Sequence, residues 1–154
     1  MAESNVMKAA LLVESSTGNT WKAAEMTADL LQQEGWTIAG LSKVRQPDLH
    51  SVQDADLVLV GTWVHGAFVF AQAPWAERTI SNLPTMSGKR VATFCTFALN
   101  PGKSLEKLNR AAGDTGAHVI GGLAMNRGKL EEHTEIFAER LIIAANALIV
   151  APQS

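Results

Sequence analysis

The sequence predicts an α/β domain in which a doubly wound, five-stranded parallel sheet is covered by helices on both faces. Short apolar runs alternate along the chain with longer segments whose apolar residues recur at the helical period. Two of these runs, Ala9–Val13 and Asp56–Gly61, are apolar at nearly every position rather than at every second one. Strands of this kind are covered on both faces, as in parallel sheets, and the intervening helices make right-handed crossovers.

The composition limits the classes of protein to be considered. With 154 residues, 47% of them hydrophobic and 18% charged, the chain suits one globular domain over residues 1–154. No apolar run approaches the length of a membrane span, and a net charge of -2 without any run of Lys or Arg argues against a nucleic-acid partner. The single Cys95 excludes an internal disulfide, and residues 1–7 lack the pattern of a secretory signal. We therefore expect a cytoplasmic protein without a transmembrane segment.

The first half of the chain alternates strand, helix and strand. The first strand leads into a helix over Trp21–Glu34, and a second strand covers Thr37–Leu41. Pro47 and Asp48 then open a short helix before the third strand, Asp56–Gly61. The first helix carries apolar residues on one face, at Trp21, Ala24, Ala28 and Leu31.

The second half continues the same alternation. A helix is predicted over Ala71–Asn82, with Pro74 near its start, where proline is tolerated. The fourth strand, Arg90–Cys95, precedes a helix over Lys103–Ala112, and the fifth strand covers His118–Ala124. The last helix runs from Leu130 to Ile149 and should bury Phe137, Leu141, Ala144 and Leu148.

The loop between the first strand and the first helix is rich in hydroxyl groups. Its sequence, Ser15-Ser16-Thr17-Gly18-Asn19-Thr20, places O–H donors and backbone N–H groups around a helix N-terminus, where the helix dipole favours negative charge. The loop contains no Lys or Arg and lacks the spaced glycines of dinucleotide-binding loops. It therefore predicts a site in which neutral donors hold a phosphate monoester. The alternative is that Ser16 or Thr17 only caps the helix.

The predicted topology places two further loops beside this one. In doubly wound sheets, ligands bind beyond the carboxyl ends of the strands at the point where the strand order reverses. With the strand order 2-1-3-4-5, that point lies beside the first and third strands. The loops expected at the site are Ser15–Thr20, Thr62–Ala71 and Thr96–Gly102.

At these loops the sequence resembles the flavodoxin family. The hydroxyl-rich loop is similar to the family loop that binds the phosphate of flavin mononucleotide (FMN). The segment Gly61-Thr62-Trp63-Val64-His65-Gly66 resembles the family segment in which a Trp covers one face of the isoalloxazine ring and a Gly lies close to its N5 atom. The stretch Cys95–Gly102 occupies the position of the second ring-contacting loop. The family usually offers a Tyr there, and since this chain has no Tyr, Phe97 is the candidate substitute.

The resemblance implies a flavodoxin-like fold, FMN as the cofactor, and neither a catalytic side chain nor a metal, because the flavin supplies the redox chemistry. The cofactor-binding residues that it implies are Ser15, Ser16, Thr17, Gly18, Asn19, Thr20, Thr62, Trp63, Val64, His65, Gly66, Thr96, Phe97, Ala98, Leu99, Asn100 and Gly102.

Three functions remain open at this point. The favoured one is an electron carrier that accepts electrons from a reductase and passes them to a redox partner protein. The second is an FMN-dependent NAD(P)H:quinone-type oxidoreductase that reduces a small quinone-like acceptor. The third is a non-redox module that binds another phosphate-bearing ligand. An acidic surface at the flavin edge would favour the carrier, but Lys103, Lys107 and Arg110 follow the third loop at helical spacing.

Several other residues are assigned to packing or docking. Trp21 and Trp36 are expected in the core, and Cys95 is expected to be a packed residue rather than a reactive thiol. The uncharged segment Gly66–Ala71 is a candidate docking patch for an apolar acceptor or a partner protein, with Phe68 and Phe70 either exposed there or packed inward.

Overall fold

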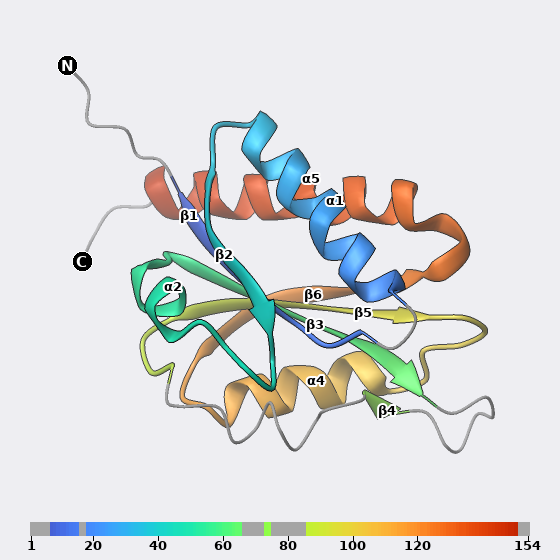
Figure 1. The fold of residues 1–154 in the computed structure, drawn as a ribbon. Helices are drawn as coiled ribbons and strands as arrows, with labels where there is room; N and C mark the ends of the chain where they lie inside the picture. The colour runs from blue at the N-terminus through green and yellow to red at the C-terminus, as the bar shows by residue number, and fades with distance from the viewer. Residues whose placement is uncertain (1–6, 16–17, 66–72, 75–85, 151–154) are drawn as a thin grey trace.

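The structure, a computed structural model, describes residues 7–15, 18–65, 73–74 and 86–150. Its central element is a sheet of five parallel strands in the order β2-β1-β3-β5-β6 (Figure 1). This confirms the predicted order 2-1-3-4-5, counted over the parallel strands alone. The strands are β1 (Lys8–Val13), β2 (Thr37–Lys43), β3 (Leu57–His65), β5 (Arg90–Phe97) and β6 (His118–Asn126).

Helices cover both faces of the sheet, as predicted. Helices α1 (Asn19–Gln33) and α5 (Leu130–Val150) lie side by side on one face, while α4 (Ser104–Gly113) lies on the other (Figure 1). The short helix α2 (Leu49–Asp54) packs beside β1 and β2, and its N-cap residue Asp48 accepts a hydrogen bond from the Ser51 amide at 3.2 Å. The predicted short helix is thus confirmed, together with the reason for its start.

Alternate residues of the strands supply two apolar layers. Leu11 of β1, for example, packs under α1 and α5, whereas its neighbour Leu12 packs on the opposite face. In the first layer, the Phe94 and Phe137 rings lie with centroids 5.5 Å apart. A Cβ atom at Gly61 would overlap three carbons of the Phe94 ring, so this strand position requires glycine. Gly61 also pairs with Phe94 in the ladder between β3 and β5.

Four predicted strands continue past their expected carboxyl ends: the second ends at Lys43 rather than Leu41, the third at His65 rather than Gly61, the fourth at Phe97 rather than Cys95, and the fifth at Asn126 rather than Ala124. The third strand continues past Gly61 to His65, because Thr62 and Trp63 go on pairing with Cys95 and Thr96 of β5. For the same reason β5 continues to Phe97, where it still pairs with β6. The predicted site loops therefore begin farther along the chain than expected.

The prediction of a helix over residues 71–82 is wrong at the two residues that the structure describes there. Ala73 and Pro74 form the short strand β4 (Ala73–Pro74), which pairs antiparallel with Val64 and His65 of β3. The other residues of that predicted helix lie outside the described part of the chain. The candidate docking patch Gly66–Ala71 also lies outside it.

Candidate functional site

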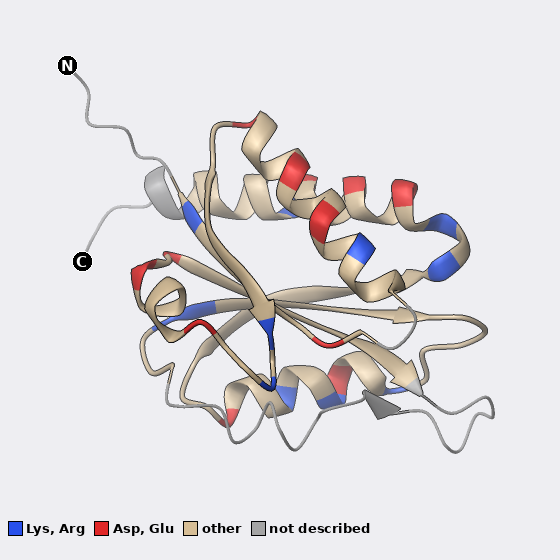
Figure 2. Cartoon of the chain, in the orientation of Figure 1, with Lys and Arg blue, Asp and Glu red and all other residues tan. Residues whose placement is uncertain are grey.

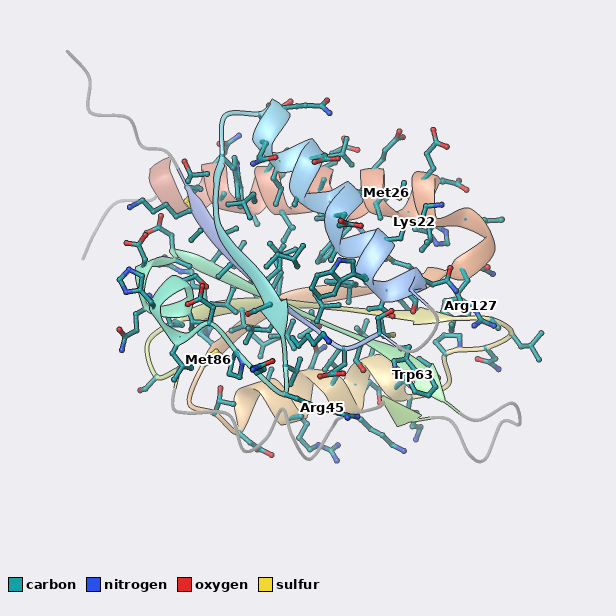
Figure 3. The ribbon with its side chains drawn as sticks, in the orientation of Figure 1. Lys22, Met26, Arg45, Trp63, Met86 and Arg127 are labelled. Atoms are coloured by element: carbon teal, nitrogen blue, oxygen red, sulfur yellow. The ribbon has the colours of Figure 1, made fainter. Side chains whose placement is uncertain are left out.

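A pocket of about 510 Å³ opens where the carboxyl ends of β2, β1 and β3 lie next to one another. Figure 3 shows Trp63 at the end of β3 and Arg45 just past the end of β2. The pocket is thus at the end of the sheet that the strand-order rule predicts. The described residues that line it are Val13, Glu14, Ser15, Gly18, Trp21, Lys43, Arg45 and Trp63.

The loop after β1 makes a tight turn into α1. The Gly18 amide donates a hydrogen bond to Oγ of Ser15 at 3.0 Å, and Gly18 has a φ of 95°, which L side chains rarely adopt. Gly18 is the N-cap residue of α1 and brings no side-chain acceptor to this helix end. The N-cap position is therefore not occupied by Ser16 or Thr17, and these two residues lie outside the described part of the chain. Ser15 uses an acceptor lone pair for Gly18, which leaves its hydroxyl proton for another acceptor.

The start of α1 is held against β5 by a buried pair of hydroxyl groups. The Oγ1 atoms of Thr20 and Thr96 are 2.7 Å apart, and each residue is 1% exposed. The sequence places Thr20 in the first loop and Thr96 in the third, and the structure brings these two predicted site residues together. This bond fixes the first turn of α1 relative to the strand ends.

The second predicted loop contributes Trp63 to the pocket, the only lining residue among those of its residues whose side chains are described. Trp63 is partly buried, whereas Thr62 is fully buried and Val64 packs against the core layer that faces α4. Strand alternation explains the difference, because residues 62 and 64 point to the opposite face from residue 63. The His65 side chain and Gly66 lie outside the described part.

No residue of the third predicted loop lines the pocket. Phe97 is partly buried at the end of β5, while Ala98, Leu99 and Asn100 are exposed and Asn100 accepts a hydrogen bond from the Gly102 amide at 2.9 Å. None of these residues is among the described residues that line the pocket. The structure therefore brings the first two predicted loops together at the pocket and leaves the exposed part of the third outside it.

Five residues that line the pocket were not among the predicted site residues: Val13, Glu14, Trp21, Lys43 and Arg45. Glu14 is 8% exposed, and its Oε1 accepts a hydrogen bond from the Arg45 amide at 3.1 Å and lies 3.7 Å from Arg45 Nε. Lys43 pairs with Val13 in the ladder between β1 and β2. The expected second strand ended at Leu41, and the parallel register extended by two residues would have placed Lys43 beside the first loop.

Charge is divided unevenly over the surface. Figure 2 shows acidic residues along α1 and α5, and basic residues at the end of β2. Among the described residues, Lys103, the N-cap residue of α4, and Arg110 within α4 are exposed and Lys107 is partly buried. None of the three lines the pocket. The basic wall of the pocket thus comes from β2 and not from the predicted stripe on α4.

Cys95 offers no reactive thiol to the site. It is fully buried in the layer that faces α4, and burial raises its pKa from 9.0 to about 12. The thiol is therefore protonated at neutral pH, in agreement with its expected packing role.

The chemistry of the pocket suits a planar ligand that carries a phosphate. Trp21 and Trp63 supply aromatic surface, Ser15 and the start of α1 supply hydrogen-bond donors, and Lys43 and Arg45 supply positive charge. Within the described part of the chain, no group of three or more His, Cys, Asp or Glu side chains is arranged to hold a metal ion. No described helix is long and apolar enough to cross a membrane.

Comparisons with known proteins agree with this arrangement. The sequence model of the flavodoxin domain matches residues 10–145. The Streptococcus pneumoniae TIGR4 flavodoxin is 21% identical with a TM-score of 0.68, over 89% of this chain and 99% of that one. The two-electron reduced Megasphaera elsdenii flavodoxin is 22% identical with a TM-score of 0.67, over 85% and 98%.

A third similar structure is part of a larger enzyme. Rubredoxin oxygen:oxidoreductase of Desulfovibrio gigas is 19% identical with a TM-score of 0.64, and the match covers 94% of this chain and 37% of that one. No curated protein matches the chain in sequence. At these identities the structural likeness establishes the fold.

Proposed function

The chain belongs to the flavodoxin family, and we propose that it binds FMN in the pocket at the ends of β1 and β3 and carries electrons from a reductase to a redox partner protein. The observation that carries this proposal is the junction of β1 with α1, where Ser15 and Gly18 line the same pocket as Trp63. Residues 1–154 act as one FMN-binding domain in the cytoplasm. The free, buried Cys95 fits this location, because the cytoplasm keeps thiols reduced.

The residues of the pocket fit the parts of FMN one by one. The loop Ser15–Thr20 would hold the phosphate, with hydroxyl and amide donors at the positive end of the α1 dipole. Trp63 would cover one face of the isoalloxazine ring, and the segment after β3 would offer backbone groups to its polar edge. When bound, the flavin accepts and returns electrons, so that the side chains need only bind it and limit its contact with water.

An FMN-dependent reductase of quinone-like acceptors is the second candidate. The basic wall made by Lys43 and Arg45 favours it, because a strongly acidic flavin surface is what the resemblance implies for a carrier. A carrier needs a separate reductase to be reduced, whereas the enzyme takes electrons from a nicotinamide nucleotide directly.

Purified protein separates these candidates. FMN-loaded protein is mixed with NADH or NADPH and a quinone, with and without a flavodoxin reductase, and the flavin absorbance and nucleotide oxidation are followed. We expect flavin reduction only with the reductase. Turnover of the quinone without it would assign the chain to the second candidate, and failure to bind FMN would refute both.

A further inference from the structure

The lining of the pocket continues past Trp63 and the first loop to the end of β2. In the order β2-β1-β3, Trp63 stands on the β3 side, Ser15 and Gly18 stand in the middle, and two cations stand on the β2 side. A ligand with its ring at Trp63 and its phosphate beside Ser15 therefore points its far end toward β2. The far end of such a ligand would meet Lys43 and Arg45.

The backbone fixes both cations at this place. Lys43 pairs with Val13, and the Val44 amide donates to the Val13 carbonyl at 3.1 Å, which keeps the end of β2 against the start of the first loop. Residues 43 and 45 lie two positions apart, so both face the pocket while Val44 is buried on the other side. The turn that follows is closed by a hydrogen bond from the Gln46 amide to the Lys43 carbonyl at 3.0 Å.

The charges of this wall favour an anion. Glu14 is the one carboxylate among the described lining residues, and it is already engaged by the amide and guanidinium of Arg45. The exposed Lys43 ammonium has no ion-pair partner among the described residues. Two cations facing one engaged carboxylate leave a net positive charge, and an Arg fork beside a Lys point charge matches phosphate oxygens.

We propose that Lys43 and Arg45 form a second anion subsite, which binds a nucleotide phosphate beyond the phosphate held beside Ser15 and Gly18. Glu14 accepts a hydrogen bond from the Arg45 amide, and its carboxylate charge opposes an anion at this subsite. The phosphate has two sources, which the test separates: the diphosphate of flavin adenine dinucleotide (FAD), or a nicotinamide nucleotide that binds next to FMN. The inference rests on the proposed function, because the flavin phosphate defines the neighbouring subsite.

The test measures dissociation constants by calorimetry for riboflavin, FMN, FAD and ADP with apoprotein, and for NADPH with FMN-loaded protein. The variant Lys43→Gln removes an exposed charge that makes no ion pair within the described part of the chain. The matched control Arg90→Gln removes an exposed cation at the amino end of β5, at the opposite end of the sheet. Thermal unfolding of each variant shows that the fold is retained.

We expect Lys43→Gln to weaken the binding of FAD or NADPH by about tenfold, a change of about 1.4 kcal/mol. The same variant should weaken FMN binding by less than about threefold. Arg90→Gln should leave the affinities for FMN and for the nucleotide unchanged. Glu14→Gln should increase the affinity for the nucleotide that Lys43→Gln affects, because it removes the opposing charge and keeps an acceptor for the Arg45 amide. An effect on FAD identifies a linked diphosphate, and an effect on NADPH alone identifies a separate nucleotide.

Equal weakening of FMN and FAD would overturn the proposal, because Lys43 would then act on the flavin phosphate itself. Weakening of none of the ligands, or the same weakening in Arg90→Gln, would also overturn it. If no flavin binds at all, the proposed function fails. ADP binding that Lys43→Gln weakens would then still support the subsite, and its absence would refute the subsite as well.

Discussion

The buried hydroxyl pair of Thr20 and Thr96 yields a quantitative prediction about how the site is held together. The two Oγ1 atoms are 2.7 Å apart and each residue is 1% exposed. Replacing either Thr with the isosteric Val leaves the other hydroxyl buried without this partner, which costs about 1–3 kcal/mol. For a chain of this size the melting temperature should fall by about 2–4 °C per kcal/mol.

The double variant Thr20→Val/Thr96→Val provides the internal control. Because both polar partners are replaced by apolar groups of the same shape, it should be far more stable than the sum of the single effects implies. Urea unfolding of the four apoproteins measures the coupling energy, which we expect to be about 1–3 kcal/mol. Strictly additive single effects would show that the hydroxyl pair does not stabilise the fold.

FMN titration of the same four proteins separates two roles of Thr20. If Thr20 only anchors α1, FMN affinity recovers together with stability in the double variant. If Thr20 also contacts the phosphate, as we propose, the double variant stays weaker by about tenfold, or 1.4 kcal/mol.

Three further predictions concern the ring site, the core and the buried thiol. Trp63→Ala should weaken FMN binding and restore part of the flavin fluorescence, because the stacked indole quenches the flavin. The control Trp36→Phe, a change at a core position, should leave the quenching intact. Unchanged quenching in Trp63→Ala would place the ring elsewhere. Gly61→Ala should destabilise the protein by about 1–3 kcal/mol in urea unfolding, because its Cβ overlaps the buried Phe94 ring, and a neutral result would mean that the ring has room to move. The pKa of Cys95 is raised from 9.0 to about 12, so the unfolded state loses its thiol proton first as the pH rises and the free energy of unfolding falls between these values. That loss should be at most about 1.4 kcal/mol per pH unit and absent in Cys95→Ala, and an identical pH dependence in both proteins would contradict it.

The parallel sheet could be predicted because its strands are apolar runs that alternate with helical segments. Its strand order was taken from the flavodoxin-like topology, and the structure confirms both. Strand ends were harder to predict, since Thr62 and Trp63 continue β3 only because Cys95 and Thr96 of a distant strand pair with them. A single sequence contains no signal for such partners.

The candidate site shows the same division. The hydroxyl pattern of the first loop marks Ser15 and Gly18 as site residues, and both line the pocket. Lys43, Arg45 and Glu14 reach the pocket through the register of β2 against β1, which depends on pairing across thirty residues of intervening chain, about the length of one crossover unit. Local sequence patterns cannot show this pairing.

The central claim is that the junction of β1 with α1 holds the phosphate of FMN, and a titration of apoprotein with FMN and riboflavin tests it most directly. The two flavins share the ring and differ in the phosphate, and charge-assisted hydrogen bonds contribute about 1.5–3 kcal/mol each. We therefore expect FMN to bind at least about a hundredfold more tightly than riboflavin, a difference of about 2.7 kcal/mol. Equal affinities for the two flavins would contradict a phosphate site at this junction.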